Sequence, residues 1–361
     1  MISSNCSIGI IGAGTSGVYL ARLLVQQGFK VDLFEKAVHP RTEGCGILLI
    51  QAGMQALYSG DPEICHAIMQ SGAPVRRFEF RNLRGGLINA ETVTYAENEL
   101  PGMLVHRKAI LAALLEKLPP TCLHGSSELV SVTQTDREVT AHFKEGHQWQ
   151  GDLLVGADGI TSKVRQFVVP GVELCYLGDL VWRGVVPDST FCSEGTFIVY
   201  ARGRGIYANF FDIGGDRTHW GFFVEQEQAD SEMGLLRPQN PVIPPAELAK
   251  LPEDARAVIA ATPPEQIISR YSYDIDPLPR LYQNRVVLIG DAAHAKSPTR
   301  ARGMSSGFED ALSLAQQLVA HDQMQPALAA FEAERMPIVH EYQRTSRDMS
   351  KSIGRRHRRV A

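Results

Sequence analysis

The feature that most constrains the fold is a glycine pattern near the start of the chain, within IGIIGAGTSGVYLARLLVQQGFKVDLFEK. Gly12, Gly14 and Gly17 have G-x-G-x-x-G spacing. They follow a short apolar run, and apolar residues then recur at helical spacing. In such a strand, turn and helix the glycines permit a tight turn, let the backbone approach a pyrophosphate, and allow the helix to pack closely on the strand. The segment therefore predicts the opening of a dinucleotide-binding α/β sheet.

The residues after this helix complete the predicted unit. Gly28 ends the helix, KVDLFE forms a second strand, and Glu35 lies 18 residues after Gly17, where a carboxylate accepts hydrogen bonds from a ribose diol. Ser16 in the turn and Lys36 beside the acid are also expected to contact the nucleotide. The pattern does not distinguish NAD from FAD, because both carry an ADP moiety.

Composition excludes several classes of protein. With 361 residues, of which 44% are apolar and 21% charged, we expect a soluble globular chain of two domains. A net charge of -4 gives no basic surface for nucleic acid. The chain has no long uninterrupted apolar stretch and no secretory signal pattern, so a cytoplasmic protein without integral membrane contact is expected. Six cysteines without C-x-x-C or metal-ligand spacing predict free thiols and no metal site.

A second stretch, NRVVLIGDAAHAKSPTRARGMSSGFEDALSLAQQL, also points to a ligand. Asp291 follows an apolar strand, and the carboxyl ends of such strands face the crevice where open α/β sheets bind ligands. A helix is expected to begin near Gly303 and Met304, and its N-terminus would stabilise negative charge of the kind that a reduced flavin carries. His294 is expected to be a packed, hydrogen-bonded histidine and not a catalytic one.

Two further segments add to this pattern, namely DLLVGADGITSKVR, which contains Asp158, and VHRKAIL, which contains Arg107. Together with GDAAHAKSP and the later EDA, they resemble the class A flavoprotein monooxygenases, the family of para-hydroxybenzoate hydroxylase and salicylate hydroxylase. The resemblance runs in order over nearly the whole chain. It implies non-covalently bound FAD in contact with Arg107 and Asp291, and a loop at Asp158 that is associated with both FAD and NAD(P)H.

One position departs from that family's pattern. The family's flavin loop is usually P-x-x-G-x-G, whereas this chain has Ala301 in place of the first loop glycine. A methyl group there disfavours a positive φ and restricts the approach of the backbone to the flavin. The neighbouring Arg300 and Arg302 would either face solvent or favour an anionic substrate or nicotinamide phosphate.

The remaining segments alternate polar and apolar residues and break at glycines, as antiparallel strands do. This texture divides the chain into a Rossmann-like FAD-binding domain (1–71, 103–172 and 283–332), a discontinuous β-sheet substrate domain (72–102 and 173–282), and a C-terminal helix and tail (333–361). Alternation places Tyr207, Asn209 and Phe211 on one face, with Arg183 on a nearby strand. These four residues form the predicted substrate pocket.

The resemblance also implies a reaction. NAD(P)H would reduce FAD, O2 would give a flavin hydroperoxide, and its distal oxygen would be transferred to a small, electron-rich, aromatic substrate without a catalytic side chain. A related reductase, oxidase or halogenase would keep the same glycines and Asp291, and a non-catalytic FAD-binding module is a further alternative. Because the chain has one glycine fingerprint, NAD(P)H is expected to bind transiently near Asp158.

Overall fold

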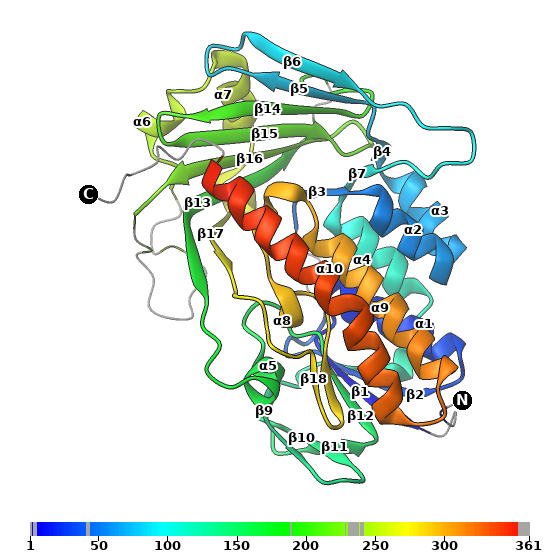
Figure 1. The fold of residues 1–361 in the computed structure, drawn as a ribbon. Helices are drawn as coiled ribbons and strands as arrows, with labels where there is room; N and C mark the ends of the chain where they lie inside the picture. The colour runs from blue at the N-terminus through cyan, green and yellow to red at the C-terminus, as the bar shows by residue number, and fades with distance from the viewer. Residues whose placement is uncertain are drawn as a thin grey trace.

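The computed structural model describes residues 6–40, 44–187, 190–227 and 242–352, together with residues 2, 229 and 238. Two main sheets lie toward opposite ends of the molecule, and the long helix α10 (Met324–Ser352) extends alongside both of them (Figure 1). The arrangement is a mixed α/β fold, as the sequence predicts.

The first strand lies inside a six-stranded sheet of order β18-β19-β12-β1-β2-β8. β1 (Ser7–Ile11) pairs in parallel with β2 (Lys30–Phe34) and β12 (Leu153–Gly156). β19 (Val286–Leu288) is parallel to β12 and β8 (Leu123–His124) is parallel to β2, whereas the edge strand β18 (Tyr282–Gln283) is antiparallel to β19. Ile8 and Ile10 of β1 are fully buried, as a parallel sheet covered on both faces requires. The predicted Rossmann-like sheet is confirmed.

Helices cover this sheet and pack against one another. α1 (Thr15–Gln26) connects β1 to β2 and packs against α9 (Gly303–Ala320), where the rings of Tyr19 and Phe308 meet edge to face with centroids 5.3 Å apart. The Tyr19 hydroxyl donates to the carbonyl of Ala56 in α2 (Gln51–Gly60) at 2.7 Å. α3 (Pro62–Ser71) and α4 (Arg107–Glu116) complete this layer. The helices thereby fix the direction in which the N-termini of α1 and α9 point.

The second main sheet has seven strands in the order β17-β13-β16-β15-β14-β5-β6. Its strands are β5 (Arg77–Arg81), β6 (Leu87–Thr92), β13 (Cys175–Val186), β14 (Thr196–Gly203), β15 (Ile206–Asp212), β16 (Thr218–Glu225) and β17 (Ile268–Asp274). All neighbours are antiparallel except β14 and β5. Strands from two distant parts of the chain therefore share one sheet.

One face of this sheet is closed by a small apolar core. Trp182, Trp220 and Phe222 pack there against residues of α7 (Glu253–Ala260) and its neighbourhood, close to α6 (Pro245–Leu248). The indole of Trp220 donates to Thr262 Oγ1 at 2.7 Å, which satisfies its N–H inside the core. The opposite face is left to meet the rest of the molecule.

Two small sheets complete the fold. The sheet β3-β7-β4, made of Gly46–Leu49, Met103–His106 and Ala73–Pro74, lies between the main sheets, and β7 contacts β15. The sheet β11-β10-β9, made of Gln148–Gly151, Val139–Phe143 and Leu129–Gln134, packs beside β1 and β12. The short helices are α5 (Lys163–Val168), α8 (Asp291–His294), η1 (Pro120–Cys122), η2 (Pro264–Gln266) and η3 (Pro298–Arg300).

The C-terminal helix begins earlier than the sequence predicts. α10 is continuous from Met324 through Pro337, so residue 333, where that helix was expected to start, falls inside it. Proline removes one intrahelical hydrogen bond. Burial of Leu328, Phe331 and Val339 outweighs that loss and keeps the helix continuous. The predicted tail from residue 353 lies outside the described residues.

Candidate functional site

The glycine turn leaves a space in front of α1. Gly12 has a φ of +107° and donates its N–H to Phe34 O at 2.8 Å, and a Cβ on it would lie 2.4 Å from Ala157 O. A Cβ on Gly17 would lie 2.1 Å from Gly12 O, so both positions require glycine for packing. A Cβ on Gly14, by contrast, would meet no atom within 4 Å. Gly14 caps α1 without a side-chain hydrogen bond, so the helix presents unpaired N–H groups toward that space.

Glu35 lies beside the same turn. Its carboxylate accepts hydrogen bonds from the N–H groups of Ala13 at 3.1 Å and Ala37 at 3.0 Å, which hold it at the carboxyl end of β2. Lys36 is exposed next to it. Ser16 has different surroundings, because its Oγ occupies the space that a Cβ on Gly307 or Gly290 would fill, at 2.0 and 2.8 Å. The Ser16 side chain therefore packs between α1 and α9 instead of facing the space in front of Gly14.

The structure brings Asp291 and the start of α9 together. Gly290, with φ +59° and ψ -143°, turns the chain between β19 and α8, and Asp291 is the exposed first residue of α8. A Cβ on Gly303, the first residue of α9, would lie 4.0 Å from Asp291 Oδ1. Met304 is half-buried against the main core. An acid and a helix N-terminus thus face one region, which suits a ligand with both hydroxyl groups and negative charge.

A buried arginine that the sequence reasoning did not single out supports this arrangement. Arg165 is 1% exposed, and its guanidinium donates to the carbonyls of Asp291 and Ala292, at 3.4 and 3.1 Å, and to Ile160 O. It thereby ties the loop before α5 to α8. Burial lowers the pKa of Arg165, and the nearby carboxylates of Asp158 and Asp291 oppose that change. Its position at the end of the DGITSKVR segment was the signal that could have identified it.

Asp158 is engaged within its own loop. Its carboxylate accepts from Ser162 Oγ at 2.5 Å and from the N–H groups of Lys163 and Val164 at 2.7 and 3.2 Å, so it caps α5. Burial raises the pKa of Asp158, and these hydrogen bonds act in the opposite direction. The side chain supports the turn, and its predicted contact with nicotinamide stays a prediction.

Arg107 is the first residue of α4 and lies next to the start of β3. Its N–H donates to Cys45 O at 3.0 Å, and a Cβ on Gly44 would lie 3.0 Å from Arg107 Cβ. Gly46, the first residue of β3, contacts the seven-stranded sheet, because its N–H donates to Nδ1 of the buried His219 at 3.1 Å. Arg107 therefore lies near the layer that joins the two main sheets.

The departure at Ala301 has a structural counterpart. Ala301 adopts a left-handed conformation with φ +52° and ψ +27°, the conformation that a glycine would favour at this position. Residues of α10 hold the loop around it, since Thr299 Oγ1 donates to Ser346 O at 2.8 Å. The Arg302 guanidinium lies 4.6 Å from the centroid of the Tyr342 ring, whereas Arg300 is exposed. Arg302 is thus directed toward α10.

The four predicted pocket residues share one face of the seven-stranded sheet. Tyr207, Asn209 and Phe211 alternate along β15, and Asn209 pairs with Gly221 of β16, which pairs in turn with Arg183 of β13. Gly221 has no side chain, and the side chains of Asn209 and Phe223 occupy the space above it, since a Cβ there would lie 2.8 Å from Asn209 Oδ1 and 3.3 Å from Phe223 Cε2. This face is opposite to the one that α7 covers.

Arg183 is the charged residue in the row of Gly221 and Asn209, and Arg270, Asp179 and Glu225 lie on the same face farther along the strands. Burial, first of all, holds the pKa of His219 well below its ordinary value, and burial also lowers the pKa of His106, so both imidazoles are neutral at pH 7. Arg183 lies 6.0 Å from the centroid of Phe223 and makes no ion pair with any described residue. Asn209 Oδ1 is buried without a hydrogen-bond partner in the described part of the chain. A positive charge and a free acceptor therefore lie on the same half-buried surface.

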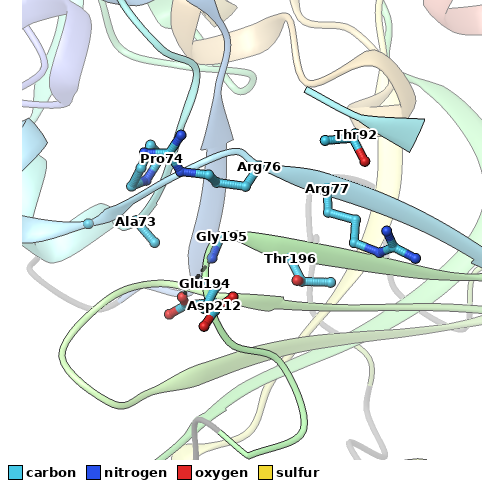
Figure 2. Close-up of a pocket in the computed structure, with 10 residues that line it drawn as sticks. Ala73, Pro74, Arg76, Arg77, Thr92, Glu194, Gly195, Thr196 and Asp212 are labelled. Carbon is cyan, nitrogen blue, oxygen red and sulfur yellow. Dashed lines mark hydrogen bonds between the residues drawn. The ribbon is translucent and has the colours of Figure 1, made fainter. Parts of the chain in front are cut away.

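A separate groove of about 620 Å³ lies where β4 and β5 meet the loops flanking β14 and β15. Figure 2 shows Arg76, Arg77, Glu194 and Asp212 around it. Asp212 points to the other side of β15 from Phe211, and its carboxylate accepts from the N–H groups of Gly195 and Gly214. None of the residues predicted to contact a cofactor or substrate lines this groove.

Other expectations concern metals, thiols and membranes. Among the described residues, no three His, Cys, Asp or Glu side chains gather as a metal site. All six cysteines are free, with Cys6, Cys65 and Cys192 buried. The helices in the described part of the chain include none that is both long and apolar enough to cross a membrane.

Comparison with known proteins finds similarity along almost the whole chain. A family profile described as "FAD binding domain" matches residues 5–346. The 3-amino-4-hydroxybenzoate 2-monooxygenase of Streptomyces cremeus is 28% identical over 98% of this chain and 89% of its own length. The 6-hydroxynicotinate 3-monooxygenase of Pseudomonas fluorescens is 28% identical over 96% of this chain and 92% of its own. The crystal structure of Klebsiella pneumoniae HpxO with FAD and uric acid has a similar fold, with a TM-score of 0.84, 23% identity, and coverage of 96% and 88% of the two chains.

The residues present fit the cofactor that this family binds. The space before Gly14 meets the unpaired N–H groups of α1, Glu35 is held beside it, and Asp291 faces the start of α9. Because the family profile spans almost the whole chain, the chain belongs to the FAD-binding domain family of class A flavoprotein monooxygenases, and it is an FAD-dependent monooxygenase.

Proposed function

We propose that this monooxygenase hydroxylates a small, electron-rich aromatic substrate that carries a carboxylate, and that Arg183 binds the carboxylate. The observation that carries the proposal is the position of Arg183, a half-buried cation without an ion pair among the described residues, on the sheet face that meets the rest of the molecule. A carboxylate is the natural partner of such a guanidinium. The substrates named for the two relatives, 3-amino-4-hydroxybenzoate and 6-hydroxynicotinate, are aromatic acids with a hydroxyl group.

The neighbouring side chains fit an aromatic ring next to that carboxylate. Tyr207 and Phe223 meet edge to face with centroids 4.9 Å apart, and Phe211 stacks on Phe197 at 4.7 Å, so aromatic surface flanks the row of Arg183, Gly221 and Asn209. Asn209 Oδ1, which has no partner among the described residues, is placed to accept from a substrate hydroxyl or amine. The neutral state of His219 leaves Arg183 as the stronger anchor for an anion.

We assign the predicted cofactor residues to individual parts of FAD. In this proposal the N-terminus of α1 at Gly14 binds the pyrophosphate, Glu35 binds the adenosine ribose, and Asp291 binds hydroxyls of the ribityl chain. Arg107, with Gly303 and Met304 at the start of α9, borders the flavin ring. Lys36 and Ser16 contribute at the edges, Ser16 by packing α1 on α9. Bound FAD supplies electron transfer from NAD(P)H and activation of O2, while the protein orients the substrate and excludes water.

We further infer that NAD(P)H binds transiently. The chain has one glycine pattern of the nucleotide-binding kind, and FAD uses it. The loop at Asp158 is stiffened by the capping of α5, and it lies at the carboxyl end of β12, where a second nucleotide can approach. The division of the chain into an FAD-binding part and a substrate part, 72–102 with 173–282, belongs to the same proposal.

A substrate screen tests the role of Arg183. Purified protein with FAD is offered hydroxybenzoates, aminohydroxybenzoates and hydroxypyridine carboxylates, together with the corresponding amides, and NAD(P)H oxidation and product are followed. We expect acids but not amides to stimulate turnover. Arg183→Met should raise KM for the best acid by about 10- to 100-fold, as loss of a charge-assisted hydrogen bond implies, with a smaller rise for Arg183→Lys. The control is Arg84→Met, an exposed arginine in the turn before β6. Equal stimulation by acid and amide, or an unchanged KM in Arg183→Met, contradicts the proposal.

A further inference from the structure

A chain of buried titratable side chains lies near Asp291. Lys296 is 8% exposed, and its Nζ is 2.7 Å from His294 Nδ1 and 3.2 Å from Ser306 Oγ. His294 Nε2 lies 2.5 Å from Asp310 Oδ2.

The hydrogen bonds fix where the charges lie. Asp310 accepts from Gly290 N–H and from Arg335 Nε, each at 2.9 Å, so its carboxylate also accepts from His294 Nε2–H. His294 Nδ1 is then the acceptor for the Lys296 ammonium. Burial, first of all, lowers the pKa of His294, and burial lowers the pKa of Lys296 to about 8. At neutral pH the imidazole is therefore neutral and the ammonium charged.

Lys296 has no direct counter-ion, although it is buried. Arg335 is paired with both Asp310 and Glu309, and no carboxylate of the described residues lies within ion-pair distance of Lys296 Nζ. Its partners are a neutral imidazole and a hydroxyl. Of the acidic groups around it, Asp291 exerts the largest electrostatic effect on Lys296, followed by Asp310 and Glu309. Lys296 and Asp291 thus interact electrostatically, and a negative charge bound beside Asp291 would interact with Lys296 as well.

The position of this charge along α9 is also unusual. Ser306 lies in the first turn of α9, and its Oγ donates to the carbonyl of Arg302, the residue before the helix begins. A cation at a helix N-terminus is disfavoured, because the helix dipole is positive there, unless an anion binds nearby. Lys296 and the start of α9 thus add positive potential to the same region, the one that Asp291 faces.

We propose that Lys296 supplies a buried positive charge that stabilises the reduced, anionic form of the FAD bound beside Asp291, and thereby raises the reduction potential of the flavin. The proposal rests on the cofactor placement given under the proposed function. Two electrons and one proton convert neutral oxidised flavin to the anionic reduced form, so one negative charge appears on reduction, and the ammonium stabilises that charge. Lys296 affects the flavin through the electric field of its ammonium group and takes no part in bond formation. It is therefore a positioning residue and not a catalytic one.

The test is the equilibrium between protein-bound FAD and a reference dye of known potential during slow chemical reduction. It uses neither substrate nor NAD(P)H, so a failure of the proposed substrate does not affect it. At about pH 7.5, between the lowered pKa of His294 and the pKa of Lys296, the ammonium is the charged member of the pair. Lys296→Met is compared with Lys296→Arg, which keeps the charge, and with Lys250→Met, which removes an ammonium near α6, where it bonds Arg204 O.

We expect Lys296→Met to lower the ratio of reduced to oxidised flavin at a given dye potential by at least about tenfold, which is about 30 mV for a two-electron couple. Lys296→Arg and Lys250→Met should stay within about twofold of the parent. The affinity for oxidised FAD, measured by fluorescence, serves as the second readout, because a merely structural role would weaken it in both Lys296 variants. A ratio in Lys296→Met within twofold of the parent, or an equal loss in Lys296→Arg, overturns the proposal.

Discussion

The glycines of the turn between β1 and α1 differ in what they contribute: two are required for packing, and one leaves space for a ligand. Gly17 and Gly12 are surrounded by protein atoms, whereas the space that a side chain on Gly14 would occupy holds no protein atom within 4 Å. We therefore expect Gly14→Ala to leave the thermal stability of the FAD-free protein within about 1 °C and to reduce FAD affinity at least tenfold, because the methyl group occupies the space of the pyrophosphate.

The matched variant is Gly17→Ala, whose Cβ would lie 2.1 Å from Gly12 O. That substitution should lower the melting temperature of the FAD-free protein by several degrees, since the backbone of α1 has to shift away from β1. Differential scanning calorimetry without FAD and fluorescence titration with FAD distinguish the two effects. If Gly14→Ala retains normal FAD affinity, the nucleotide does not bind at this turn.

The second residue-scale prediction concerns Ala301. Its left-handed φ of +52° costs about 1 to 2 kcal/mol in an L-residue. Glycine removes that cost but increases the entropy of the unfolded chain. Ala301→Gly should therefore raise the free energy of unfolding by about 0.5 to 1 kcal/mol, measured by urea denaturation. Ala329→Gly, at an exposed helical position of α10, should lower it by about 1 kcal/mol. A loss of stability in Ala301→Gly would mean that the loop is not strained at this residue.

At the scale of elements, α10 fastens the loop that carries Ala301 to the rest of the fold. Gln343 donates to the carbonyls of Ile275 and Ala295, and Arg347 binds both carboxylate oxygens of Asp274 at 2.7 and 2.8 Å. These bonds hold α10 against β17 and against the segment between α8 and η3. In Figure 1 the C-terminal half of α10 extends toward the seven-stranded sheet, so one helix links both parts of the site.

Asp274 is 1% exposed, so its charge depends on this pairing. Arg347→Ala should lower the free energy of unfolding by about 2 to 4 kcal/mol, because it leaves a buried carboxylate unpaired. Arg344→Ala, one turn earlier on the same helix, removes an exposed pair with Glu341 and should cost less than about 0.5 kcal/mol. Similar losses in both variants, measured by urea denaturation, would show that Asp274 does not need Arg347.

The same elements show what the sequence could predict. Alternation along β15 and the apolar strand β1 follow from local patterns, and the structure has both. The row that joins Arg183, Gly221 and Asn209 depends on the register of three strands, which no local pattern determines. Arg165 and Lys296 were missed for a similar reason, because tertiary packing provides their partners, the carbonyl of Ala292 for Arg165 and Ser306 of α9 for Lys296. The earlier start of α10, at Met324 instead of residue 333, was missed because burial of Leu328 and Phe331 against the core extends the helix.

At the scale of the whole molecule, the proposed site lies where the helices on the six-stranded sheet meet the seven-stranded sheet. We expect such a site to control the order of events, since the chain has one glycine-rich nucleotide pattern and the proposed function assigns it to FAD. We expect stopped-flow reduction of the flavin by NAD(P)H to be slow without substrate and faster by orders of magnitude with it, because substrate has to expose the ring. Fast reduction without substrate contradicts this gating and favours an oxidase or reductase.

The cofactor itself should dissociate intact. The residues assigned to FAD in the proposed function would hold it through hydrogen bonds and a helix N-terminus. Heat or acid should therefore release FAD into the supernatant, and flavin that stays with the precipitated protein contradicts non-covalent binding.

The most direct test of the central claim is turnover of the best aromatic acid under ¹⁸O₂ with NAD(P)H, followed by mass spectrometry of the product. The account predicts a hydroxylated acid that contains one ¹⁸O atom for each NAD(P)H oxidised productively, with that product lost at the same acid concentration in Arg183→Met. Product without the label, or NAD(P)H consumption that yields only hydrogen peroxide with every aromatic acid, would contradict it.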